Sequence, residues 1–223
     1  SLKMTSVTYN TFDCGTLEAI HVPEGHSSLM DEDGVLYNKS KTTLYLFPQQ
    51  KDPTGFALPD TLVIIRSYAM KGFQGTHLIL PETLETIEGY AFQYSALTSI
   101  HIPAKVKTIG AYAFQANSSG KLQSVTFEEN GALKTISNYA FAGNTWLTRI
   151  DLPDNITSLG TYAFEGCYRL EEVILPAALK QIQNNTFSKC RNLRTVVLQE
   201  GIEKIANYAF SESGVTEMTI PTT

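Results

Sequence analysis

Cysteines are the residues of this chain with the most direct potential for chemistry, as nucleophiles or metal ligands. There are three, Cys14, Cys167 and Cys190, and an odd number excludes a complete disulfide framework. Cys167 and Cys190 occupy the same place in two successive repeats, where neighbouring strands would lie about 4.8 Å apart. That spacing allows a disulfide, but we favour two buried thiols. A catalytic cysteine is not expected, because no histidine stands at a matching position in these repeats.

Histidines are the second candidates, as metal ligands. His21, His77 and His101 fall at outward positions of predicted strands, the last two on neighbouring strands. A zinc site needs at least a third protein ligand, and we expect no Asp or Glu beside these histidines on the sheet. The sequence therefore predicts no metal and no cofactor, and we interpret the histidines as part of a polar patch.

Carboxylates are the third candidates. Asp31-Glu32-Asp33-Gly34 superficially resembles the start of a calcium loop, but Val35, Leu36 and Tyr37 follow where ligands are needed, so we expect an ordinary turn. Glu171 and Glu172 are neighbours on a predicted strand and point to opposite faces, which excludes an acid/base pair. The chain also has no G-x-S-x-G, G-x-x-x-x-G-K-[ST], H-E-x-x-H or G-x-G-x-x-G motif. We expect no enzyme.

Composition narrows the class of protein further. Of 223 residues, 43% are hydrophobic and 17% charged, and the net charge is −5 without any basic block. A nucleic-acid partner is not expected, because phosphate binding requires clustered Lys and Arg. No apolar run reaches the length of a membrane span. Ser1-Leu2-Lys3-Met4 shows no signal-peptide pattern, and we expect a mature or engineered start.

An internal repeat of about 23 residues must position all these side chains. Ala-Phe or a degenerate copy recurs seven times, with spacings of 22, 22, 27, 23, 23 and 23 residues. The repeated aromatic or Met positions are Met70, Phe92, Phe114, Phe141, Phe164, Phe187 and Phe210. A unit this short cannot bury its apolar side alone, so stacked units must share one continuous core in a solenoid.

Each unit divides into three parts. A stretch such as Leu97/Ile100/Ile102/Pro103 alternates in and out, as a strand does, and proline ends it. The following L-x-x-I is a second short extended or turn segment. The x-x-A-F part predicts one turn of α- or 3₁₀-helix. The same opening pattern occurs at Leu17/Ile20/Val22/Pro23.

Residues 24–57 interrupt the period and predict a hairpin-containing irregular repeat. Runs at 35–37 and 43–47 flank the polar turn 38–41. The second run is expected to join the sheet, because Pro48 matches Pro103 in its own repeat.

The unit L-x-x-I-x-L-P-x-x-L-x-x-I-x-x-x-A-F-x-x-C resembles the BspA-like leucine-rich repeat of bacterial surface proteins, over roughly residues 12–221. The resemblance implies one leucine-rich-repeat solenoid domain over 1–223, a right-handed β-α-type superhelix. It would have a parallel β-sheet on the concave face, with short strands and 3₁₀ or helical turns on the convex face. The chain departs from the best-known repeat pattern, which has Asn or Cys after the strand. Here a column of Cys14, Ser119, Asn144, Cys167 and Cys190 precedes the strand instead.

Members of that family are typically exported or surface-attached and are associated with adhesion. The resemblance therefore implies a non-catalytic module, extracellular or on the cell surface, that binds a host, matrix or cell-surface protein. The alternative is a structural segment of a larger repeat protein that packs end to end, since the terminal Met218–Thr223 strand has no polar cap.

The expected binding surface is the outward side of the concave sheet. Its apolar members Ile174 and Val197 would lie side by side, and its shortage of aromatic rings disfavours carbohydrate. Trp146 is expected to be structural. The predicted binding residues are His77, Ile79, Ser99, His101, Ser124, Thr126, Arg149, Asp151, Glu172, Ile174, Thr195 and Val197.

Overall fold

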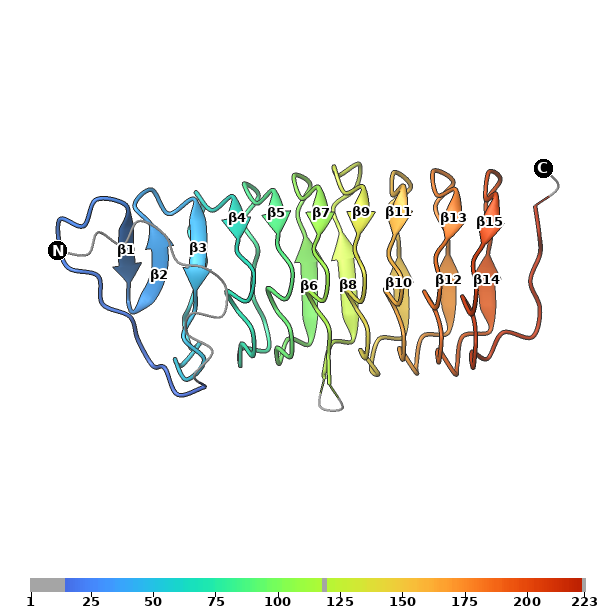
Figure 1. Cartoon of the computed structure of the whole chain (residues 1–223), viewed down its shortest axis with the longest axis horizontal. Coiled ribbons are helices and arrows are strands. Elements are labelled where there is room, and N and C mark those ends of the chain that lie inside the picture. Colours follow the sequence, from blue (N-terminus) through green and yellow to red (C-terminus); the bar gives the residue numbers. More distant parts are fainter. Residues whose placement is uncertain (1–14, 118–119, 222–223) are drawn as a thin grey trace.

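The chain winds into successive turns, which we call coils, stacked along one axis (Figure 1). The computed structural model describes residues 15–117 and 120–221. The solenoid expected from the repeat is confirmed. Five regular coils contribute two strand segments each, and the two coils before them contribute one each.

The first set of strands comes from the alternating I-x-L stretches. These strands are β6 (Ser99–Ile102), β8 (Ser124–Phe127), β10 (Arg149–Asp151), β12 (Glu172–Ile174) and β14 (Thr195–Val197). β6 pairs with β8, and β12 pairs with both β10 and β14, all in parallel. Ile100 and Ile102 are buried while Ser99 and His101 are exposed, so the predicted alternation is confirmed.

The second set comes from the short Thr-Ile segments and forms a longer ladder. Its strands are β4 (Ile64–Ile65), β5 (Thr86–Ile87), β7 (Thr108–Ile109), β9 (Thr135–Ile136), β11 (Ser158–Leu159), β13 (Gln181–Ile182) and β15 (Lys204–Ile205). Of these, β4, β5, β7, β9 and β11 belong to one eight-stranded sheet, and β13 pairs separately with β15. The solenoid therefore has two strand-bearing sides.

The predicted helical turn around Ala-Phe is wrong, and no helix occurs in the described residues. Alternate backbone N–H groups of this turn bond to the next coil: Phe92 N donates to Ala113 O at 2.7 Å, and Phe114 N donates to Ala140 O at 2.8 Å. A helix would direct these groups to its own preceding turn. The β-α-type superhelix is therefore not supported. The stack is also nearly straight in Figure 1, so we call the predicted concave surface the outward face.

The N-terminal part contains β1 (Leu29–Glu32), β2 (Val35–Asn38) and β3 (Thr43–Leu46). β2 and β3 form the predicted hairpin, and β1 adds an unpredicted antiparallel strand. β3 pairs with β4, so it joins the Thr-Ile ladder rather than the set containing β6. The match between Pro48 and Pro103 was therefore misleading. Residues 17–22 form no strand, and Ile20 N bonds to Gly34 O instead.

The core is a file of stacked aromatic rings within aliphatic side chains. Consecutive ring centroids from Phe92 to Phe210 lie 5.0–5.6 Å apart with planes within 6° of parallel. Burial is complete for Phe92, Phe141, Phe164 and Phe187. Because the coils from Phe92 to Phe210 each supply one ring, and Met70 takes the same place in the coil before them, the stack shares one core.

Candidate functional site on the outward face

The outward face is formed by the exposed side chains of β6, β8, β10, β12 and β14. Ten of the twelve predicted binding residues lie on these strands, and all ten are exposed except the half-buried Glu172. His77 and Ile79 are exposed too, Ile79 by 88%, but their segment is not a strand. The expectation that His77 and His101 occupy neighbouring strands is therefore wrong.

The strand register places an apolar pair near the C-terminal end of this face. Ile174 lies directly opposite Val197, as the alternation predicted, and their exposed fractions are 39% and 36%. In the preceding pair of strands, Asp151 lies opposite Ile174 and Arg149 opposite Glu172. An apolar centre therefore has charged neighbours on one side.

Charges on this face are held by contacts between outward side chains. The Arg149 Nε atom donates to both carboxylate oxygens of Asp151, at 2.8 and 3.0 Å, and its Nη1 atom lies 3.7 Å from Glu172 Oε2. Such exposed pairs contribute little to stability. Their main effect is to orient the charges that a partner would meet.

His101 has an acidic neighbour, contrary to expectation. Its Nδ1 atom lies 3.0 Å from Thr126 Oγ1, and its Nε2 atom lies 3.2 Å from Glu128 Oε2. Glu128 follows β8 by one residue and continues its outward alternation, so the sequence contained this signal. The described residues nevertheless hold no group of three His, Cys, Asp or Glu side chains arranged for a metal ion.

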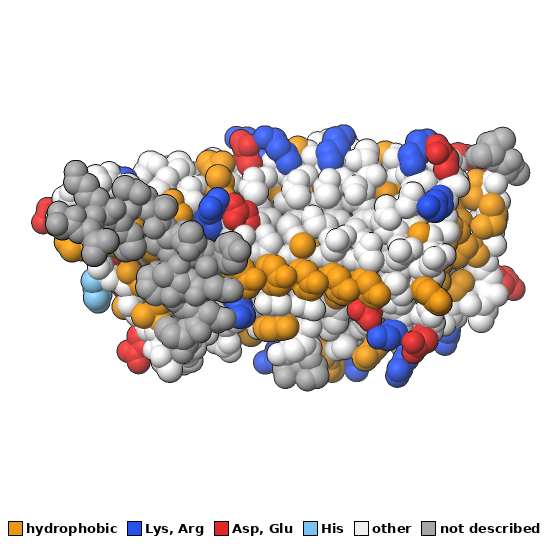
Figure 2. Space-filling model, in the orientation of Figure 1, with side chains coloured by type: hydrophobic (Ala, Val, Ile, Leu, Met, Phe, Trp, Pro, Cys, Tyr) orange, Lys and Arg blue, Asp and Glu red, His pale blue; other side chains and the backbone are white. Residues whose placement is uncertain are grey.

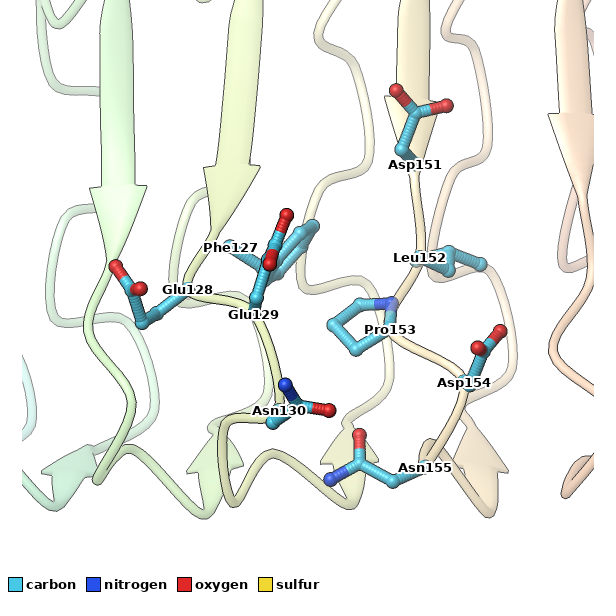
Figure 3. Close-up of a pocket in the computed structure, with 9 residues that line it drawn as sticks. All are labelled: Phe127, Glu128, Glu129, Asn130, Asp151, Leu152, Pro153, Asp154 and Asn155. Carbon is cyan, nitrogen blue, oxygen red and sulfur yellow. The ribbon is translucent and has the colours of Figure 1, made fainter.

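A depression of about 490 Å³ adjoins the ends of β8 and β10. Figure 3 shows its lining residues on two neighbouring coils: Phe127, Glu128, Glu129, Asn130, Asp151, Leu152, Pro153, Asp154 and Asn155. Asn155 Nδ2 donates to Gly131 O, while Asn155 Oδ1 is buried without a hydrogen-bond partner in the described part of the chain. Four carboxylates give this depression a negative character.

The two described cysteines are buried, free thiols, which confirms the favoured interpretation. The Cys167 thiol donates to Phe141 O at 3.4 Å, and the Cys190 thiol donates to Phe164 O at 3.2 Å. Burial raises the pKa of both thiols, that of Cys190 to about 12. They are therefore unsuited to act as nucleophiles. Cys14 and Ser119, in the same column, lie outside the described residues.

The sequence analysis also predicted an ordinary turn at Asp31–Gly34 and a structural role for Trp146. Asp31 accepts hydrogen bonds from Val22 N at 2.7 Å and Gly34 N at 3.4 Å, and Asp33-Gly34 forms the turn between β1 and β2. The ordinary turn is thus confirmed. Trp146 is 43% exposed, and the Arg169 guanidinium lies 3.7 Å from its ring centroid.

A ladder of stacked tyrosines was missed by sequence reasoning. Its members, which immediately precede Ala in the Ala-Phe motifs or their variants, are Tyr68, Tyr90, Tyr112, Tyr139 and Tyr162. Adjacent ring centroids lie 4.6–4.7 Å apart, with planes within 9° of parallel. Figure 2 shows a stripe of hydrophobic side chains that runs along the stack of coils. The recurrence of Tyr immediately before Ala was the sequence signal from which this ladder could have been predicted.

Residues 15–117 and 120–221 contain no helix that is long and apolar enough to cross a membrane.

Comparison with solved structures identifies similar bacterial proteins. A leucine-rich repeat protein from Eubacterium ventriosum is 30% identical with a TM-score of 0.84, over 93% of this chain and 55% of that one. A leucine-rich cell surface protein from Faecalibacterium prausnitzii is 27% identical with a TM-score of 0.51, over 77% of this chain and 39% of that one. The chain thus spans about half or less of these relatives. Comparison with curated proteins gives no match.

The family model named BspA type leucine rich repeat region matches residues 40–132 and 117–223. These two matches include every regular coil, in agreement with the two strand sets and the Phe file. The chain belongs to the BspA-type leucine-rich repeat family.

Proposed function

We propose that this chain is a non-catalytic binding module of a bacterial cell-surface or secreted protein. The outward face contacts the partner, and the partner is a host extracellular-matrix or cell-surface protein. The observation that carries this proposal is the Ile174–Val197 pair, set on a continuous row of parallel strands beside oriented charges. The Faecalibacterium prausnitzii relative, described as a cell surface protein, supports the location.

The chemistry of the outward face favours a protein over a sugar. Protein interfaces combine an apolar centre with a polar rim, and Ile174 and Val197 have Asp151 and Glu172 beside them. Besides Ile174 and Val197, the outward side chains of these strands are Ser, Thr, His and charged residues, with no Phe, Tyr or Trp on which a sugar could stack. An extended array of this kind is suited to contacts with an equally extended protein surface.

The test is binding of purified protein to immobilised collagen, laminin and fibronectin, measured by surface plasmon resonance. Ile174→Asp and Val197→Asp each place a charge in the apolar pair, and we expect each to weaken binding about tenfold or more. Tyr208→Asp is the matched control, because it also replaces an exposed apolar side chain, 70% exposed, away from the outward strands.

Circular dichroism and thermal unfolding establish that all three variants are folded. If Ile174→Asp and Val197→Asp bind as well as the parent, the outward face is not the contact surface. If none of the three matrix proteins binds the parent, the proposed partner class loses its support.

An alternative is a structural segment that packs end to end with a second copy. Ile205, Tyr208 and Ile220, which are 39%, 70% and 64% exposed, would lie in such a contact. Sedimentation velocity distinguishes the two functions. The alternative predicts concentration-dependent association that Tyr208→Asp abolishes, whereas the binding module predicts a monomer unaffected by that substitution.

A further inference from the structure

The tyrosine ladder brings five phenols together in a row. Neighbouring rings are nearly parallel, at 4.6 Å for Tyr68–Tyr90, Tyr90–Tyr112 and Tyr139–Tyr162, and at 4.7 Å for Tyr112–Tyr139. All five are partly exposed, so a solution oxidant can reach their edges. Since the coils repeat by translation, equivalent ring carbons of adjacent tyrosines face one another.

The backbone fixes this arrangement. Each ladder tyrosine has a positive φ between 57° and 63°. Such a conformation is unfavourable for a residue with a large side chain. The positive φ is maintained by backbone hydrogen bonds to the next coil. For example, Tyr90 N donates to Ala111 O at 2.8 Å, and Tyr112 N donates to Asn138 O at 2.9 Å. The phenols are therefore positioned by the sheet-like stacking and do not depend on a flexible loop.

From this geometry we propose that the ladder is a site of oxidative modification, at which adjacent tyrosines are joined as dityrosine within one molecule. The oxidant is hydrogen peroxide acting through a haem peroxidase. Each such bond would join two neighbouring coils covalently on this face.

The reaction balances without any group from the protein beyond the two phenols. Each phenol loses one electron and one proton to give a phenoxyl radical, and hydrogen peroxide accepts both electrons and both protons to become two water molecules. The two radicals form a carbon–carbon bond between the ring positions next to their oxygens. The two ring hydrogens at the new bond then move to the oxygens, which restores both aromatic phenols.

Proximity explains why the ladder should react in preference to isolated tyrosines. Radical coupling needs two phenoxyl groups to meet, and a fixed neighbour replaces a bimolecular encounter with an intramolecular one. Tyr94 and Tyr168 are 41% and 40% exposed, and Tyr208 70%, so the oxidant can reach them too. They therefore serve as internal competitors for the ladder.

In the test, the 223-residue chain is treated at low concentration with horseradish peroxidase and limiting hydrogen peroxide. Dityrosine fluorescence, intact mass and mapping of cross-linked peptides are measured. We expect a monomer that has lost two hydrogen atoms for each cross-link, with the bonds located between adjacent ladder tyrosines.

Two double variants make the test specific. Tyr90→Phe with Tyr139→Phe keeps all rings stacked but leaves Tyr68, Tyr112 and Tyr162 without a neighbouring phenol, and we expect at least a tenfold loss of intramolecular dityrosine. Tyr68→Phe with Tyr162→Phe removes the same number of phenols but leaves Tyr90, Tyr112 and Tyr139 consecutive, and should retain it. Equal yields in the two variants would overturn the proposal, as would cross-links confined to Tyr94, Tyr168 or Tyr208, or to covalent dimers.

Discussion

The side-chain amide of Asn144 donates a hydrogen bond to the carbonyl oxygen of Phe114, in the preceding coil, at 2.9 Å. The same Nδ2 atom donates to Phe141 O at 2.8 Å, within its own coil. Cys167 and Cys190 make the equivalent inter-coil contacts to Phe141 and Phe164. The column that precedes each strand therefore supplies donors to the carbonyl groups of the buried residues Phe114, Phe141 and Phe164.

Replacement of Asn144 by Ala should lower the free energy of unfolding by about 1–3 kcal/mol, because two buried carbonyl groups lose a donor. Asn144→Cys is the matched variant, since Cys occupies this position in the two following repeats. It should retain a weak donor and lose less stability than Asn144→Ala. Urea unfolding followed by circular dichroism measures both, and equal losses would show that the donor contributes nothing.

Cys167 and Cys190 should resist reaction with thiol reagents in the folded protein. Both are fully buried, and burial raises their pKa, so the reactive thiolate is scarce and shielded. With Cys14→Ser as the background, Ellman's reagent at neutral pH should label neither thiol until guanidinium is added. Rapid labelling without denaturant would mean that the Cys column opens readily in the native state.

The same thiols predict a loss of stability in alkali. The pKa of Cys190 rises from 9.0 to about 12 on folding, so between these values the unfolded chain has lost the proton that the folded chain retains. Stability is therefore fully present below pH 9 and falls as the pH rises toward 12. Urea midpoints measured across this range should decline.

The control for the alkaline decline is Cys167→Ala with Cys190→Ala. This variant is less stable throughout, because removing buried side chains leaves cavities, but its midpoint should decline less steeply with pH. A slope as steep as that of the parent would assign the decline to tyrosines or other groups.

The coil stacking and the inward side chains were predictable because apolar residues recur with a fixed period. The outward positions of β6 to β14 followed from simple alternation, as the exposed Ser99 and His101 illustrate. The Thr-Ile ladder was harder to predict, because a two-residue strand such as Thr86–Ile87 has no periodicity of its own. Its strand character comes from neighbours in other coils.

The misassigned features share a physical cause, which is hydrogen bonding between coils. Ala-Phe suggested a helical turn, yet Phe92 N bonds to Ala113 O of the next coil. Tyr90 gave no indication of its positive φ, since large residues rarely adopt one. At the site, Thr98 N bonds to Thr76 O, but no strand forms around His77 and Ile79. Such pairing depends on the whole stack and cannot be read from one unit.

Asn185 provides the last prediction, because it occupies the ladder position between Tyr162 and Tyr208. Its φ of 56° matches theirs at 60°, so the backbone already has the conformation that a ring there requires. Asn185→Tyr would add two ring contacts, about 0.5–1.5 kcal/mol each. The loss of Asn, which tolerates positive φ well, offsets these by about 1 kcal/mol. Thermal unfolding should therefore show unchanged or slightly higher stability.

Asn185→Ala loses the favourable backbone preference without gaining a ring, and should be less stable than the parent by about 1 kcal/mol. If the Tyr variant is no more stable than the Ala variant, stacking does not stabilise the ladder, and its tyrosines are retained for another reason.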